Sequence, residues 1–285
     1  MNATIAVDSP GVEAKACGAA FDAAVDADER DWTILLPFHN ERAHLPDTIA
    51  SLAEQTEPFV LLLIDNGSSD GGGAVAAAAC ERLGVEHRLI VERRPGKVAA
   101  LHSGSRQART RFIATCDADT YYPPDYLARA RRLLENGGVM VGARFRPRAA
   151  KPWVRWVAAL HLFIAALILP GQCLSGGAGQ AFRADVLEAA GGFDQAQWDF
   201  VLEDHEICHR LASQGEILYD PDFWCDPAQR DRKRPTTRWT LGERLIYHLV
   251  AGTAGNWFFY NFLAARLAKR GLSSARLRVD PDAPS

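Results

Sequence analysis

Two aspartates separated by one residue, Asp117 and Asp119, are the residues whose type and spacing most directly suggest chemistry. They follow residues 111–115, in which Phe112, Ile113, Ala114 and the β-branched Thr115 have the composition of a short buried strand. In an extended chain, residues i and i+2 project to the same side, so both carboxylates could face one ligand. Carboxylate oxygens suit hard divalent cations, which also bind substrate phosphates. The pair predicts a metal–diphosphate site, with a polar turn as the alternative.

Two more polar loops follow predicted strands. Residues 32–36 form an apolar strand that Pro37 is expected to end, because proline lacks a backbone donor. Residues 59–64 form a second apolar strand that leads into Asp65 and Asn66. Strands that alternate with helices and are almost continuously apolar predict a parallel α/β sheet with helices on both faces. Ligands bind at the carboxyl ends of such strands, so the three loops predict one crevice.

Charged side chains also stand at two predicted helix starts. Lys97 stands at the start of a predicted helix, where the helix dipole disfavours a cation. This unfavourable position suggests that Lys97 lies near a phosphate group of a ligand. The alternative is an ordinary surface lysine. Glu203 and Asp204 stand at the start of a later predicted helix, where the helix dipole favours anions. Helix capping would account for the presence of one of these two acids. A second acid held there could act as a general base.

Two apolar segments occupy the second half of the chain. Residues 153–169 are short for a membrane span and contain Arg155, which favours a buried or interfacial helix. Residues 241–267 are helical and aromatic, typical of an interfacial anchor, with packing on the domain or a dimer contact as alternatives. The basic residues 229–234 could neutralise a diphosphate or form a solvated loop. A loose polar tail is expected from Ser273 onward.

Length and composition narrow the class of protein. The 285 residues suit one large domain with appendages: a mobile leader at 1–30, a main domain at 31–225 and a helical, membrane-interfacial extension at 226–285. The net charge of −3 argues against a nucleic-acid partner. The six scattered cysteines form neither a zinc framework nor a disulfide scaffold. With no signal peptide recognised, we expect a cytoplasmic protein, with peripheral contact at the inner face of the cell membrane.

These stretches together resemble family 2 glycosyltransferases, in the same order and at similar spacings over residues 31–225. The resemblance is carried by PFHNE at 37–41, DNGSSD at 65–70, GKVAAL at 96–101, DAD at 117–119, GG at 176–177, GGFD at 191–194, and ED at 203–204 with Arg210. It implies a GT-A fold: an α/β, Rossmann-like and mostly parallel sheet flanked by helices, here followed by C-terminal amphipathic helices. It also implies inverting transfer of a sugar from a UDP-, dTDP- or GDP-linked donor, with Mg²⁺ or Mn²⁺.

The resemblance also implies roles for individual residues. The nucleotide sugar would be bound by Pro37, Phe38, Asn40, Glu41, Asp65, Asn66, Lys97, Asp117 and Ala118. Asp119 and Asp117 would ligate the metal, and Asp204 would be the general base with Glu203 beside it. The acceptor side would be shaped by Gly176, Gly177 and Ala178. The acceptor stays open, and a lipid-linked one fits the two apolar segments.

Departures from the family pattern leave other points open. Asn66 stands where the family often has Asp, so the identity of the nucleotide is undetermined. The Gln-x-x-Arg-Trp signature of processive synthases is not clear, which favours single addition. A sugar nucleotidyltransferase is disfavoured because residues 38–41 replace its glycine-rich loop. A non-catalytic nucleotide-binding or membrane-associated protein with this fold would be indicated by loss of Asp119 or Asp204, and both are present.

Overall fold

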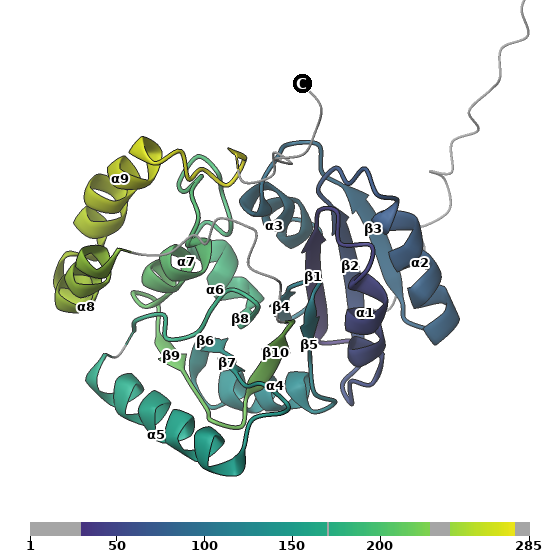
Figure 1. The fold of residues 1–285 in the computed structure, drawn as a ribbon, viewed down its shortest axis with the longest axis horizontal. Coiled ribbons are helices and arrows are strands. Elements are labelled where there is room, and N and C mark those ends of the chain that lie inside the picture. Colours follow the sequence, from purple (N-terminus) through teal and green to yellow (C-terminus); the bar gives the residue numbers. More distant parts are fainter. Residues whose placement is uncertain (1–29, 170, 229–239, 277–285) are drawn as a thin grey trace, which may run out of the picture.

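The computed structural model describes residues 30–169, 171–228 and 240–276 (Figure 1). Apart from Arg30, the predicted leader lies outside these ranges, as does the basic run at 229–234. The centre of the molecule is a seven-stranded sheet in the order β3-β2-β1-β4-β8-β6-β9. Its strands are β1 (Trp32–Phe38), β2 (Phe59–Asp65), β3 (His87–Val91), β4 (Phe112–Cys116), β6 (Gly138–Gly142), β8 (Gly179–Arg183) and β9 (Glu216–Leu218).

The sheet is mostly parallel, as expected, but not wholly so. β1 pairs in parallel with both β2 and β4, and β2 pairs in parallel with β3. β8 runs antiparallel between β4 and β6. A small second sheet joins β5 (Thr120–Tyr121), β10 (Trp224–Pro227) and β7 (Arg144–Phe145). Because β5 begins directly after Asp119, this second sheet fixes where the Asp117–Asp119 turn leaves the main sheet.

The prediction that Pro37 ends the first strand is wrong. β1 continues through Phe38, with Pro37 opposite Ile64 of β2. On the other side, pairing with β4 stops at Leu35 opposite Thr115. The missing N–H of Pro37 therefore falls in a stretch of β1 that has only one neighbouring strand, where a proline is tolerated.

Helices cover both faces of the sheet. The helices α1 (Leu45–Ala53), α2 (Gly72–Leu83) and α4 (Tyr126–Glu135) share one core with alternate residues of β1. The helices α3 (Lys97–Ser105), α6 (Ala184–Ala189) and α7 (Glu203–Leu211) share a second core with the opposite face. The predicted apolar stripe of α1, namely Leu45, Ile49 and Leu52, is fully buried. The two cores hold the carboxyl ends of β1, β2 and β4 at one edge.

The C-terminal helices pack against the domain. α8 (Leu241–Asn256) kinks at Ala254 and leads into a π-helix, η1 (Trp257–Leu263), and then α9 (Ala264–Lys269). Their buried aromatic side chains form a third core with Trp198 and Val201. The prediction of a loose tail from Ser273 is wrong over its first residues, because the Ser274 hydroxyl accepts a hydrogen bond from the Val98 N–H.

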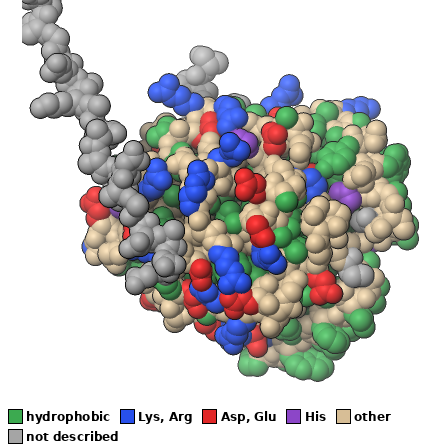
Figure 2. Space-filling view, turned by 180° about the vertical axis from the view of Figure 1, so that it is seen from behind, with side chains coloured by type: hydrophobic (Ala, Val, Ile, Leu, Met, Phe, Trp, Pro, Cys, Tyr) green, Lys and Arg blue, Asp and Glu red, His purple; other side chains and the backbone are tan. Residues whose placement is uncertain are grey.

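α5 (Pro152–Ile168) lies on the surface, at the lower left of Figure 1. Leu162 is the buried residue of this helix, while Trp153 and Trp156 are 66% and 67% exposed. The alternative of a buried helix is therefore wrong, and the interfacial one remains. Within the residues that the structure describes, no helix combines the length and the apolar character that crossing a membrane requires. Figure 2 shows hydrophobic side chains gathered along this border of the molecule, at its lower right.

Candidate active site

The loops after β1 and β2 hold each other in place. The Asn40 N–H donates to the Ser68 hydroxyl at 3.1 Å, and the Asn40 side-chain oxygen accepts from the Ser69 N–H at 2.8 Å. Asp65 accepts from the Ser68 N–H at 2.7 Å. Asn40 has a φ of 55°, a left-handed conformation that asparagine tolerates better than most residues. Predicted donor-binding residues from two strands are thus brought together, while Pro37 and Phe38 are buried within β1.

Asn66 has a structural task of its own. Its side chain is 4% exposed, and its amide group donates to the carbonyl oxygens of Glu92 at 3.2 Å and Arg94 at 2.7 Å. Its oxygen accepts from the Gly96 N–H at 2.8 Å. The hydrogen bonds of Asn66 therefore fix the turn that precedes Lys97. Direct contact of Asn66 with a nucleotide stays a prediction.

Lys97 is an ion-pair partner rather than a free surface lysine. Its ammonium lies 2.7 Å from Asp117 Oδ1 and 3.4 Å from Glu203 Oε1. Burial would lower the pKa of Lys97, but the two carboxylates outweigh burial and raise the pKa above its ordinary value. Ion pairs thus bring together residues 97, 117 and 203, which are far apart in sequence, at the carboxyl end of β4.

The Asp117–Asp119 segment is a turn, not the extended chain that the spacing suggested. The Tyr122 hydroxyl accepts from the Asp117 N–H at 2.8 Å and donates to the Ala178 carbonyl. Ala118 packs in the first core, and its carbonyl accepts from the Thr48 hydroxyl at 2.9 Å. A direct contact of Ala118 with the nucleotide sugar stays a prediction. Tyr122, which the sequence analysis did not single out, ties the turn to Ala178 of the predicted acceptor-side segment.

These two aspartates fit a hard divalent cation by the chemistry of their donor set. Both are half-buried carboxylates at the end of a strand, and Lys97 engages only Oδ1 of Asp117. Mg²⁺ is bound in proteins by one or two carboxylates together with substrate phosphates. Two carboxylates beside a cationic side chain therefore match a site that a metal and a diphosphate would complete.

Glu203 and Asp204 open α7 behind a strained residue. Leu202 has a φ of 66°, and a bulky side chain in this left-handed region is a genuine outlier. Burial raises the pKa of Glu203 above its ordinary value despite Lys97. Burial would also raise the pKa of Asp204, but the charge of His205 and its hydrogen bonds outweigh burial and lower it. When the pKa values of two adjacent acids are shifted in opposite directions, this is typical of a pair in which one group acts as the acid and the other as the base.

The glycines of the acceptor side allow the chain to approach this cluster. A Cβ on Gly177 would lie 3.2 Å from the Asp204 Cβ and 3.4 Å from the Lys97 ammonium. A Cβ on Gly176 would meet the Phe145 ring at 2.4 Å. Gly177 therefore sits where any larger residue would fill the space between the lysine and the aspartate, and the acceptor-side role of this segment stays a prediction.

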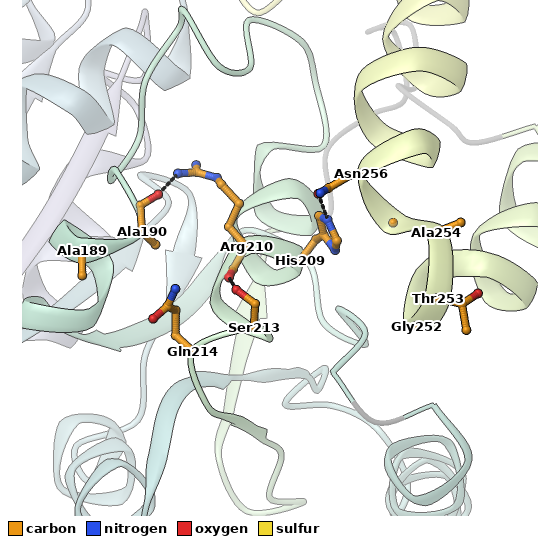
Figure 3. Close-up of a pocket in the computed structure, with 11 residues that line it drawn as sticks. Ala189, Ala190, His209, Arg210, Ser213, Gln214, Gly252, Thr253, Ala254 and Asn256 are labelled. Carbon is orange, nitrogen blue, oxygen red and sulfur yellow. Dashed lines mark hydrogen bonds between the residues drawn. The ribbon is translucent and has the colours of Figure 1, made fainter.

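A separate cavity of about 450 Å³ lies between α6, α7 and the kink of α8 (Figure 3). His209 and Arg210 line it, and His209 Nε2 lies 2.8 Å from Asn256 Oδ1. It contains none of the residues that the sequence predicted for the donor, the metal or the base. We therefore place the candidate active site at the Asp117–Lys97–Asp204 cluster.

The fold and this cluster define the class of protein: a glycosyltransferase of the GT-A fold. The model of the family "Glycosyl transferase family 2" matches residues 33–185. This chain belongs to family 2 of the glycosyltransferases, and the prediction of family, fold class and enzyme type is confirmed.

Relatives and solved structures agree with this class. The chain is 32% identical over 129 residues to an undecaprenyl-phosphate 4-deoxy-4-formamido-L-arabinose transferase of Pseudomonas aeruginosa, a match that covers 44% of this chain and 38% of the relative. The chain therefore matches well under half the length of that relative. A mannosyltransferase from Pyrobaculum calidifontis, solved with GDP-Man and Mn²⁺, gives a TM-score of 0.63 at 21% identity, covering 91% of this chain and 81% of that one. S. aureus TarS 1–349 with UDP-GlcNAc gives 0.56 at 14% identity, covering 84% and 73%.

Proposed function

We propose that this enzyme transfers a sugar from a nucleoside diphosphate sugar to an acceptor hydroxyl, with inversion at the anomeric carbon. The observation that carries the proposal is the placement of Asp204, whose pKa is held low, beside the Lys97–Asp117 pair at the carboxyl edge of the sheet. An ionised carboxylate of this kind can accept a proton from an incoming hydroxyl. A carboxylate poised as a base favours a hydroxyl over a phosphate acceptor, since an ionised phosphate has no proton that must be removed.

The residues would divide the reaction between them. Asp204 takes the proton of the acceptor hydroxyl while that oxygen bonds to the anomeric carbon. The bond from this carbon to the diphosphate breaks on the opposite face, and the nucleoside diphosphate leaves with the electron pair. Lys97 places a positive charge beside Asp117, where the leaving diphosphate would lie. The loops that contain Asn40 and Asp65 hold the nucleoside.

A divalent cation would be held by Asp117 and Asp119, and two of the solved neighbours contain Mn²⁺. Such an ion supplies charge stabilisation for the departing diphosphate. The choice between Mg²⁺ and Mn²⁺, and between UDP-, dTDP- and GDP-linked donors, stays open in this proposal.

A lipid-linked acceptor and peripheral membrane contact complete the proposal. The Pseudomonas aeruginosa relative acts, by its name, on undecaprenyl phosphate. The acceptor proposed here shares the lipid with that relative but presents a hydroxyl to Asp204. α5 exposes large apolar side chains beside the basic residues Arg148 and Lys151, and α8 exposes Leu245 and Leu249. Apolar side chains next to basic ones are typical of helices that lie in a membrane interface. We propose that residues 31–225 form the transferase domain and that residues 226–285 add a helical extension, which with α5 contacts the cytoplasmic face of the membrane.

The catalytic proposal is tested by Asp204→Asn. This variant should bind nucleotide as the native protein does and lose transfer by about 10²–10⁴-fold, which is the usual contribution of a general base. Native turnover by the variant would reject Asp204 as the base. Asp199→Asn serves as the control, because Asp199 lies on the same segment and its side chain is bound by Gln195 rather than by the site.

The donor is identified by thermal shift with UDP, GDP, dTDP and CMP, each with and without Mn²⁺. A nucleotide at about 100 times its Kd should stabilise the native state by about 2.7 kcal/mol. A shift with one nucleotide that depends on metal would name the donor class. The absence of any shift would favour a non-catalytic protein of this fold.

A further inference from the structure

We propose that His205 is a positioning residue for the transfer reaction, which rests on the proposed role of Asp204 as base. The imidazole would hold the Asp204 carboxylate in one orientation and in its ionised form. Tyr247, from the C-terminal helix α8, would in turn hold the imidazole. The C-terminal extension thereby becomes part of the catalytic apparatus, in addition to any contact with a membrane.

One oxygen of Asp204 is occupied by His205. Asp204 Oδ1 accepts from the His205 backbone N–H at 2.9 Å and lies 2.9 Å from His205 Nδ1. An ionised carboxylate is an acceptor only, so Nδ1 must carry the proton of this hydrogen bond. Asp204 Oδ2 makes no hydrogen bond within the described part of the chain. The geometry therefore assigns Oδ1 to anchoring and leaves Oδ2 for the acceptor hydroxyl.

The imidazole is itself enclosed by groups from two other elements. Its ring contacts the Tyr247 ring edge-on at 5.7 Å between centroids. The Tyr247 hydroxyl accepts from the Cys173 N–H at 3.0 Å. The Cys173 sulfur, a carboxylate oxygen of Asp204 and a ring nitrogen of His205 lie within 4.8 Å of one another. Tyr247 is buried. With both its neighbours fixed, the ring cannot turn away from Asp204 without disrupting the packing of α8.

The charges around the pair favour the ionised states. Lys97 from α3 and Glu203 from α7 face Asp204, while Cys173 and, from α8, Tyr247 and His248 lie close to the imidazole. Burial would lower the pKa of His205, but the hydrogen bonds to the Cys173 sulfur and the Asp204 carboxylate, with the charge of that carboxylate, outweigh burial and raise the pKa. The pKa values of the Cys173 thiol and the Tyr247 hydroxyl are both raised, Tyr247 chiefly by burial, so both groups stay neutral near pH 7. The imidazole is then the cation in direct contact with Asp204.

The test compares His205→Phe and His205→Asn with His209→Phe. His209 lies one turn further along α7, stacks on Phe259, hydrogen-bonds Asn256 and does not contact Asp204, so its variant reports the effect of replacing a histidine of α7 that is not bound to Asp204. For each protein, kcat, the KM for the donor, nucleotide binding, thermal stability and the pH dependence of kcat/KM are measured.

We expect His205→Phe to lower kcat by about 10- to 100-fold, which is part of the 10²–10⁴-fold that a general base contributes. Nucleotide binding should be unchanged. Because His205 lowers the pKa of Asp204, its removal should move the acidic limb of kcat/KM to higher pH. His205→Asn should recover part of kcat, since its amide can donate in place of Nδ1. His209→Phe should leave the limb in place.

Two results would overturn the inference. One is a His205→Phe enzyme with the native acidic limb and no more loss of kcat than His209→Phe, which would make His205 a packing residue. The other is full transfer by Asp204→Asn, which would remove the base itself and with it the proposed mechanism. An inactive Asp204→Asn together with a normal His205→Phe would reject the positioning role and leave the proposed function standing.

Discussion

The donor edge and the C-terminal extension are ordered by different forces. The donor edge, meaning the loops at 38–41, 65–70 and 92–97, is fixed by hydrogen bonds: the side chains of Asn40 and Asp65 accept from backbone N–H groups, and the Asn66 amide donates to a backbone carbonyl. The extension, meaning α8, η1 and α9, is fixed by aromatic packing in the third core. Hydrogen bonds set geometry closely, whereas apolar burial supplies most of the free energy of folding. Changes at the donor edge should therefore impair function first, and changes in the extension should impair stability first.

The extension nevertheless contributes polar groups to the catalytic helix. The Tyr260 hydroxyl donates to the buried Glu206 at 2.6 Å, Asn256 lies against His209, and Tyr247 lies against His205. All three contacts are made to α7, the helix that begins with Glu203 and Asp204. The extension therefore contacts the helix of the proposed base, while the donor edge contains residues proposed to hold the nucleotide.

Within the donor edge, the largest effect on function should follow from Asp119→Ala. Loss of a metal ligand should abolish the metal-dependent thermal shift by nucleotide and reduce transfer by about 10²–10³-fold, the scale of lost electrostatic stabilisation. Thermal stability without ligand should change little, because the side chain lies in a turn. Asp222→Ala, at an exposed site outside the cluster, is the control; equal losses in both variants would contradict a metal role for Asp119.

The largest effect on stability should follow from Glu243→Ala in the extension. The Glu243 side chain is 1% exposed, accepts from Arg266 at 2.8 Å and Arg270 at 2.9 Å, and caps α8 through Thr240. We expect the free energy of unfolding at pH 7 to fall by about 2–4 kcal/mol, measured by urea denaturation.

This loss should depend on pH. The helix-capping hydrogen bonds and the arginines outweigh burial and hold the pKa of Glu243 below its ordinary value. The stabilisation is therefore present above the unfolded pKa of about 4.3 and is lost as pH falls through the folded pKa. The difference between native and variant proteins should narrow at acidic pH; a difference that stayed constant would show that charge plays no part.

A smaller effect should follow from Asn66→Asp, which restores the residue common in the family. Aspartate cannot donate to the carbonyls of Glu92 and Arg94, so we expect a loss of about 1–3 kcal/mol in the free energy of unfolding. Nucleotide preference should not change, because Asn66 is occupied by the backbone. Asn136→Asp, on an exposed helix end, is the control, and an altered nucleotide preference in Asn66→Asp would show that Asn66 contacts the ligand.

The smallest effect on the folded protein should follow from replacing both Trp153 and Trp156 with serine. Both are about two-thirds exposed, so thermal stability should stay within a few degrees. Binding to anionic liposomes should fall by about tenfold, since each tryptophan would bury apolar surface at the interface. Val91→Ser, an exposed apolar residue outside α5 and α8, is the control. Equal liposome binding by all three proteins would argue against this membrane-facing surface.

Local sequence patterns predicted several strands of the main sheet, the loops that follow them and the family. Apolar runs such as 59–64 and short motifs such as Asp117–Asp119 are local patterns. Such patterns can be recognised in the sequence without knowledge of the fold. Their order along the chain was enough to predict a mostly parallel α/β sheet and to place the candidate base on a helix start. Lys97 was singled out because its position opposed the helix dipole, and that conflict marked a real ion-pair site.

The meeting of residues that are distant in sequence could be seen only in the folded chain. In the folded chain, β8 pairs antiparallel with β4, and Ser274 contacts the start of α3 although 176 residues of sequence separate it from Val98. Cys173 and Tyr247 lie around His205. His205 follows Asp204 directly, and that adjacency was the one signal that could have revealed it. Contacts of this kind carry no local pattern, because they depend on which faces of α7, α8 and the loop before β8 pack together. Packing is decided by the whole chain at once, which is why a candidate base could be proposed from the sequence while the residues packed around it could not.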